Sequence, residues 1–107
     1  MTFQKEIDMK PFFIEISDDA LWDIQDIWSY IFNESPKNSI DFVVGLYLSI
    51  GKLEYFPSIG KKIDYWVHIK VYKSHYILYD IEQSSRRIIV LRVIHTSNYP
   101  EYQKYFL

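Results

Sequence analysis

The chain has 107 residues, of which 49% are hydrophobic and 19% aromatic, so it suits one globular domain with one core and is not a disordered chain. It contains no cysteine, which excludes disulfide bonds, thiolate metal sites and a cysteine nucleophile. The net charge of −2 combines −6 over residues 1–56, from four Lys or Arg and ten Asp or Glu, with +4 over residues 57–107, from eight and four. Proteins that function by binding the nucleic-acid backbone are usually much more basic.

Two further features bear on location and domain organisation. No apolar run approaches the ~20 residues that span a bilayer, and the N-terminus lacks the apolar core of a secretory signal. We therefore expect a cytoplasmic protein with no membrane association. We also expect a single domain over residues 1–107, with residues 1–8 as a loose extension.

A short strand and a helix hairpin are predicted first along the chain. Residues 11–16 alternate like a strand, and Ser17 begins a helix because its side chain can accept from the free N–H groups of the first turn. That helix should end near Asn33. A second helix follows, with Ser35 as its cap and Pro36 in its first turn. The link between the helices is so short that they must lie antiparallel.

Apolar residues recur at helical spacing in both helices. In the first they are Leu21, Ile24, Ile27, Trp28, Ile31 and Phe32; in the second they are Ile40, Val43, Val44, Tyr47, Leu48, Ile50 and Leu53. The turn over residues 57–60 ends the second helix.

Three apolar runs rich in Val, Ile and Tyr then predict a three-stranded antiparallel meander between Trp66 and His95. The last run is apolar on both faces, which indicates a central strand. In the first run we expect Val67, Ile69 and Val71 to face the helix hairpin, leaving the mixed face with His68, Lys70 and Tyr72 exposed. Residues 101–107 suggest a short C-terminal helical turn. The fold class is α+β.

Three local patterns stand out in this order of elements. The second helix ends in L-x-x-x-P-x-x-G from Leu53 to Gly60, the next strand contains Y-x-x-Y at Tyr76 and Tyr79, and the last strand ends in V-I-H at His95. Together with the helical patterns, they resemble the RelE/ParE superfamily of type II toxin–antitoxin toxins over roughly residues 9–97.

This resemblance implies a small growth-inhibiting toxin, of the kind linked to plasmid stabilisation, that is held inactive by a cognate antitoxin in a hetero-oligomer. RelE-like members cut mRNA in the ribosome, and ParE-like members poison DNA gyrase. The helical pattern and the His-terminated strand are closer to ParE, so gyrase inhibition is the expected function. A ribosome-dependent mRNA endonuclease is one alternative. A toxin that only binds its antitoxin is the other, because Thr96-Ser97-Asn98 follow His95 where ParE-like sequences usually carry arginines.

The endonuclease alternative requires a base, an acid and a cation for the phosphorane charge. His95 or His75 is the candidate base or acid, and Arg92, Lys70 or Lys73 is the candidate phosphate ligand. Tyr102 lies nearer than Tyr99 to the place where RNA-cutting relatives use a C-terminal tyrosine. The competing interpretation is that His95 only caps the strand end and that the tyrosines only pack.

Further basic and histidine residues of the sheet region are candidates for contact with nucleic acid or another target. They are Lys61, Lys62, His68, Lys70, Lys73 and His75. His68 and His75 are placed to approach each other across neighbouring strands, but no carboxylate partner is evident, so we expect no metal site and no cofactor.

Overall fold

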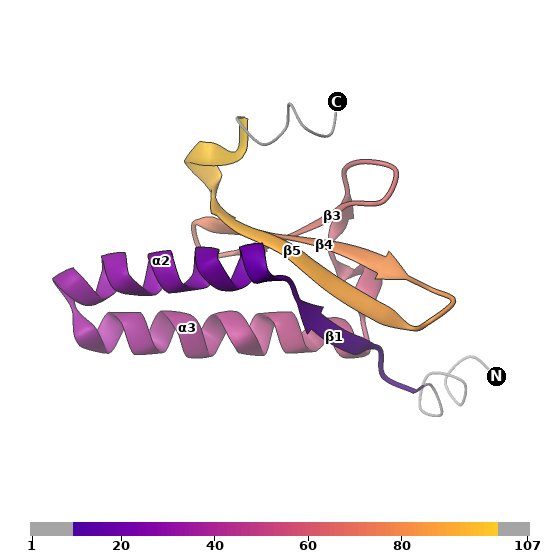
Figure 1. Cartoon of the computed structure of the whole chain (residues 1–107), viewed down its shortest axis with the longest axis horizontal. Helices are drawn as coiled ribbons and strands as arrows, with labels where there is room; N and C mark the ends of the chain where they lie inside the picture. The colour runs from indigo at the N-terminus through magenta and orange to yellow at the C-terminus, as the bar shows by residue number, and fades with distance from the viewer. Residues whose placement is uncertain (1–9, 101–107) are drawn as a thin grey trace.

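The computed structural model describes residues 10–100 (Figure 1). The predicted N-terminal extension over residues 1–8 and the helical turn over residues 101–107 lie outside this part of the chain. The main elements are β1 (Phe13–Ile16), α2 (Asp18–Glu34), α3 (Pro36–Gly51), β2 (Lys61–Lys62), β3 (His68–Tyr72), β4 (His75–Glu82) and β5 (Arg87–His95). Short 3₁₀ turns follow α3, at Lys52–Glu54 and Pro57–Ile59, and β5, at Thr96–Asn98.

Both helices begin at the caps that the sequence predicts. The Ser17 hydroxyl accepts from the backbone N–H of Ala20 at 3.1 Å, and the Ser35 hydroxyl accepts from that of Asn38 at 3.3 Å. Only Ser35 separates α2 from α3, which confirms the antiparallel hairpin.

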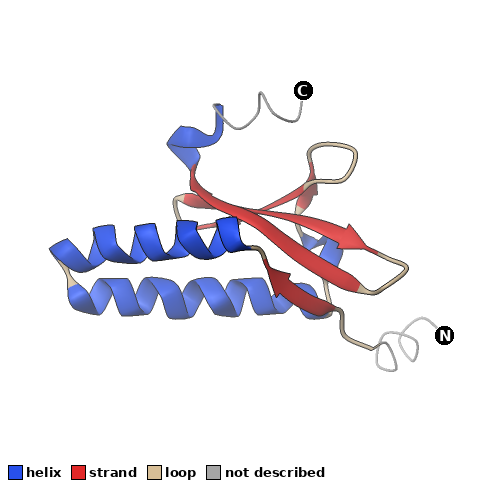
Figure 2. Cartoon of the chain, viewed as in Figure 1, coloured by secondary structure: helices blue, strands red, loops and turns tan. Residues whose placement is uncertain are grey.

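The sheet has five strands in the order β1-β5-β4-β3-β2. Strands β3, β4 and β5 form the predicted antiparallel meander, and β5 is central. β1 pairs with β5 in parallel, so the helix hairpin connects β1 to the rest of the sheet. The hairpin packs along one face of the sheet and extends beyond it (Figure 2).

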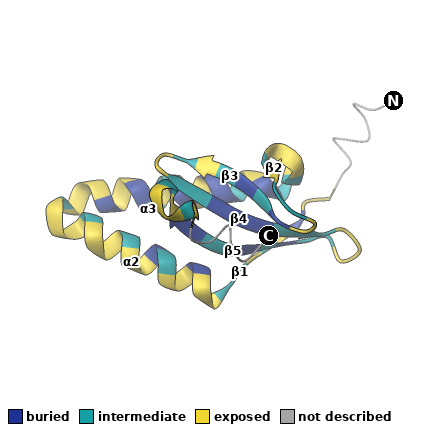
Figure 3. Ribbon diagram, turned by 90° about the horizontal axis from the view of Figure 1, so that it is seen from above, coloured by how far each residue is buried: buried dark blue, intermediate teal, exposed yellow. Residues whose placement is uncertain are grey.

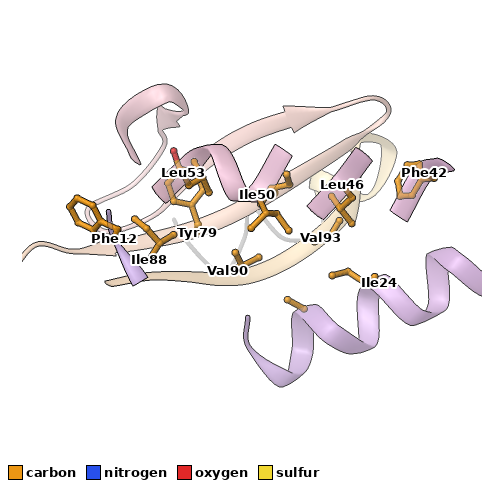
Figure 4. Close-up of a cluster of buried hydrophobic side chains, with 12 residues drawn as sticks. Phe12, Ile24, Phe42, Leu46, Ile50, Leu53, Tyr79, Ile88, Val90 and Val93 are labelled. Atoms are coloured by element: carbon orange, nitrogen blue, oxygen red, sulfur yellow. The ribbon is translucent and has the colours of Figure 1, made fainter. Parts of the chain in front are cut away.

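The main core lies between the helix hairpin and the sheet (Figure 4). Leu46 of α3, Ile77 and Tyr79 of β4, and Ile88 and Val90 of β5 are fully buried there. A smaller cluster on the opposite face of the sheet consists of Val67, Ile69, Leu78 and Ile94.

The predicted orientation of β3 is wrong. Ile69 belongs to the cluster on the face away from the helices, and Val71 is exposed. The polar residues face the helices instead: the Tyr72 hydroxyl donates to the Phe42 carbonyl of α3 at 2.9 Å, and Lys70 Nζ donates to the Ser49 carbonyl at 2.6 Å. Long side chains with polar ends can therefore pack against a helix when its carbonyls accept their hydrogen bonds.

A β-bulge interrupts the alternation in β5. Leu78 pairs with Arg92 and Tyr79 pairs with Val90, so Leu91 has no partner on β4. The extra residue changes which positions share a face. Ile88 and Val90 thus lie in the same core cluster as Val93, although a strict period of two would place Val93 on the opposite face.

The helix hairpin leaves many apolar side chains exposed. Most of its residues are exposed where it extends past the sheet (Figure 3). They include Leu21, Trp22, Trp28 and Phe32 of α2 and Ile40, Val44, Tyr47 and Leu48 of α3. We call these eight residues the apolar hairpin face. Within residues 10–100, no helix is long and apolar enough to cross a membrane.

Candidate functional site

The predicted site residues do not converge on one place. Arg92, His75 and His95 lie near the end of β5, beside α2. His68, Lys70 and Lys73 contact the core or α3, and Lys61 and Lys62 line a separate pocket at the β2 edge of the sheet. Tyr102 lies outside the described residues.

Arg92 is held by a carboxylate of α2. Its Nε donates to Asp23 Oδ2 at 2.7 Å and its Nη2 donates to Asp23 Oδ1 at 2.8 Å. Asp23 Oδ2 also accepts from the backbone N–H of Val93 at 2.9 Å. This bidentate pair uses the Nε–Nη2 edge of the guanidinium, which is an edge that also binds phosphate.

His95 and His75 face each other across β5 and β4, with ring centroids 5.1 Å apart. His95 Nδ1 accepts from the backbone N–H of Ser97 at 3.1 Å and lies 2.7 Å from the Ser97 hydroxyl. Ser97 therefore occupies Nδ1, and Nε2 is the ring nitrogen left for other partners. His95 does cap the turn that follows the strand, as the structural interpretation predicts.

Acidic residues line the pocket that contains this histidine pair. The pocket has a volume of about 170 Å³ and is bordered by Asp23, Asp26 and Asn98 as well as by both histidines. Asp23 is neutralised by Arg92, whereas Asp26 forms no ion pair among residues 10–100. The remaining charge disfavours an RNA phosphate in this pocket.

The three candidates on the helix side of β3 and its turn are engaged in packing. His68 stacks on Tyr79 with a centroid distance of 5.4 Å, and burial, followed by Lys62, lowers its pKa. Burial, followed by Lys52, also lowers the pKa of Lys70, whose ammonium binds the Ser49 carbonyl near the end of α3. Lys73 Nζ lies 5.9 Å from the ring centroid of Phe42. His68 and Lys70 are half-buried, whereas Lys73 is exposed in the turn after β3.

Lys61 and Lys62 line a different pocket, which includes Ile69 of the smaller cluster. Lys61 pairs with Ile69, whereas Lys62 pairs with His68 on the helix side of the sheet. The pocket has a volume of about 510 Å³ and also contains Tyr76 and Tyr99, whose rings meet edge to face at 5.1 Å. Burial, followed by Tyr76, raises the pKa of Tyr99, so its hydroxyl stays protonated. This pocket joins cations and aromatic rings, a combination that suits nucleic-acid bases and backbone.

Sequence reasoning missed Asp23, which decides the state of Arg92, and it placed the histidine pair wrongly. His68 lies opposite Tyr79, whereas His75 lies opposite His95. The sequence marks Asp23 only as one of several acidic residues along α2. Its contact with a residue 69 positions away becomes visible only once the helix packs on the sheet.

The motif residues Pro57, Gly60 and Tyr79 act together as a structural unit. The buried Tyr79 hydroxyl donates to the Pro57 carbonyl at 2.7 Å and accepts from the Gly60 N–H at 3.1 Å. Burial raises the pKa of this hydroxyl, so it stays protonated and keeps donating. The spaced glycine, proline and tyrosine therefore fix the loop to β4.

This architecture, a strand and a helix hairpin followed by an antiparallel meander, occurs in a solved toxin–antitoxin complex. It is similar to a chain in the crystal structure of the toxin–antitoxin complex RelBE2 from Mycobacterium tuberculosis, with a TM-score of 0.61 and 20% sequence identity over 82% of this chain and 94% of that one. At this identity, the likeness establishes the fold alone. No curated protein sequence matches the chain significantly.

The family is established by the sequence. The family described as the ParE toxin of the type II toxin–antitoxin system parDE matches residues 14–99. The chain therefore belongs to the ParE toxin family within the RelE/ParE superfamily, and it is the toxin component of a type II toxin–antitoxin system.

Proposed function

We propose that this toxin acts by binding a protein target, DNA gyrase, and not by cutting RNA. The observation that carries the proposal is the state of Arg92. Asp23 occupies its guanidinium through two hydrogen bonds of 2.7 and 2.8 Å, so the cation best suited to a phosphorane is already neutralised. A binding mode of action requires no such cation.

The histidines support the same proposal. Ser97 occupies His95 Nδ1, and the ring shares its pocket with Asp26. An acidic pocket repels the substrate phosphate that an RNA-cutting histidine must approach. A His95→Ala variant should therefore remain as toxic as the parent.

The direct test is gyrase supercoiling with purified toxin. We expect inhibition at about stoichiometric concentrations, and equal inhibition by the His95→Ala variant. Unchanged supercoiling at a large excess of folded toxin would reject gyrase as the target. Circular dichroism spectra of both proteins would confirm that they are folded.

A second candidate is the ribosome-dependent mRNA endonuclease, favoured by the pocket that Lys61 and Lys62 share with Tyr76 and Tyr99. Cytoplasmic induction of the toxin should separate the two functions. Filamentation with intact mRNA and DNA damage supports gyrase, whereas mRNA cut at ribosome-occupied codons supports the nuclease. Loss of cutting in a Lys61→Ala, Lys62→Ala variant would assign it to this pocket.

We further propose that a cognate antitoxin covers the apolar hairpin face in a hetero-oligomer. The RelBE2 structure is itself a toxin–antitoxin complex, and here both helices expose large apolar side chains such as Trp28 and Leu48. Exposed apolar surface of this extent marks an interaction site. If strong expression leaves growth unaffected while the antitoxin still binds, the chain functions only as an antitoxin-binding relic.

A further inference from the structure

The cross-strand histidine pair has a geometry that its packing role does not explain. His75 and His95 are directly opposite each other on antiparallel strands. The neighbouring hydrogen bond, from the Thr96 N–H to the Ser74 carbonyl at 2.9 Å, identifies them as a non-hydrogen-bonded pair. In such pairs the side chains approach most closely, and these rings lie 5.1 Å apart at an interplanar angle of 84°.

In each ring, Nδ1 is closed to an outside ligand. His95 Nδ1 contacts Ser97, and His75 Nδ1 is buried, with no hydrogen-bond partner. No hydrogen bond within residues 10–100 engages Nε2 of either ring.

The charge around the pair selects the kind of ligand. Asp26 on α2 lines the same pocket and has no ion-pair partner among the described residues, while the charge of Asp23 is balanced by Arg92. The pocket is therefore negative when both histidines are neutral. A cation gains from this field and an anion loses.

We propose that His75 and His95 form a two-histidine site for a borderline divalent transition-metal ion such as Zn²⁺. Imidazole nitrogen suits this class of metal, at Zn–N distances of about 2.0–2.1 Å. No group of three or more His, Asp or Glu side chains within residues 10–100 is placed to hold a metal, so water completes the coordination.

The Ser97 hydroxyl provides the outer contact that such a site needs. When Nε2 of His95 binds a metal, the ring proton moves to Nδ1, which then loses the bond from the Ser97 N–H and donates to the Ser97 hydroxyl 2.7 Å away. Outer contacts of this kind orient metal-ligating imidazoles. The proposal is independent of the toxin's target, because it rests only on this pair and its pocket.

The test is calorimetric titration of the full-length, tag-free toxin with Zn²⁺ at pH 7.5, together with the melting temperature with and without the metal. We expect one equivalent to bind and the melting temperature to rise by about 5 °C at ten times the dissociation constant. His95→Gln, at an exposed position, should weaken binding at least tenfold. The matched control is His68→Gln, which removes the third histidine, and it should bind as the parent does.

Two outcomes would overturn the proposal. One is the absence of saturable Zn²⁺ binding by the folded parent. The other is equal binding by the parent and His95→Gln, which would place the metal elsewhere on the chain. His75→Phe keeps an aromatic ring against Phe42 and supplies a second variant of the pair, and it too should lose binding.

Discussion

At the scale of single residues, Asp23 is the most consequential side chain outside the core. Its carboxylate accepts from two nitrogens of Arg92 and from the backbone N–H of Val93. One residue of α2 thereby fixes both the side chain and the backbone of β5, just beyond the bulge at Leu91. The same contacts remove Arg92 from the candidate catalytic residues.

We predict that Asp23→Ala lowers the free energy of unfolding by about 2–3 kcal/mol, because it leaves a partly buried guanidinium and a backbone N–H without their acceptor. Urea denaturation measures the change. Asp26→Ala, on the same helix but without an ion pair among the described residues, is the control and should change stability by less than about 0.5 kcal/mol. Equal effects of the two substitutions would contradict the assigned role of Asp23.

His75 links stability to pH. Burial and the neighbouring His95 lower its pKa in the folded state, so the folded chain binds this proton less readily than the unfolded chain does. The contribution of His75 to the free energy of unfolding is complete above its unfolded pKa of about 6.5. It is lost as the pH falls from that value through the lower folded pKa. His68, whose pKa is also lowered, acts in the same direction.

We therefore predict that the free energy of unfolding decreases between pH 7.5 and pH 5.5. In His75→Phe the decrease should be smaller, because one of the two histidines no longer titrates. Urea denaturation at both pH values provides the measurement. A variant with the full decrease of the parent would show that His75 does not contribute to it.

At the scale of elements, the loop over residues 57–60 depends on close backbone packing. A Cβ atom at Gly60 would lie 2.5 Å from both the Ile69 carbonyl oxygen and the Tyr79 hydroxyl. The glycine is therefore required by space and not by its backbone conformation, since its φ is −83°. The glycine of the motif L-x-x-x-P-x-x-G is therefore explained by this packing of Gly60 against β3 and β4.

We predict that Gly60→Ala destabilises the fold by about 2 kcal/mol, because the Ile69 backbone must shift to admit the methyl group. Gly51→Ala is the control. A Cβ at Gly51 would meet nothing within 4 Å, so the higher helix propensity of alanine should stabilise α3 by up to about 1 kcal/mol. Thermal denaturation should give melting temperatures that move in opposite directions.

At the scale of the whole molecule, the helix hairpin has apolar residues on two sides. Ile24 and Leu46 are buried against the sheet, whereas Trp28, Val44 and Leu48 are exposed. The helical spacing predicts all but one of these residues and does not separate the buried set from the exposed set. The exposed set forms the surface that we assign to the antitoxin.

We predict that Val44→Glu weakens antitoxin binding at least tenfold and leaves the fold intact, because the charge would be buried in the complex and not in the free toxin. Val71→Glu on β3 is a matched control, since Val44 is 54% exposed and Val71 is 61% exposed. Calorimetric titration with the antitoxin would measure both affinities. Val71→Glu should bind as the parent does, and weakening by both variants would argue against a contact confined to the hairpin.

The sequence by itself determined the elements whose causes are local. Ser17 and Ser35 cap helices through bonds to residues three positions ahead, and the short link between the helices forces the hairpin. Strand β5 is identifiable as central because a strand covered on both faces is apolar on both faces. The ordered motifs also indicated the toxin family, which the family match confirmed.

Only the tertiary structure decided which face of β3 meets the helices and which charges meet each other. A period of two separates the residues of a strand into two faces but does not say which one is buried. Lys70 and Tyr72 face α3 because backbone carbonyls of that helix accept their polar ends. The Asp23–Arg92 pair and the His75–His95 pair likewise join residues far apart in the chain, and their partners are set by packing and register.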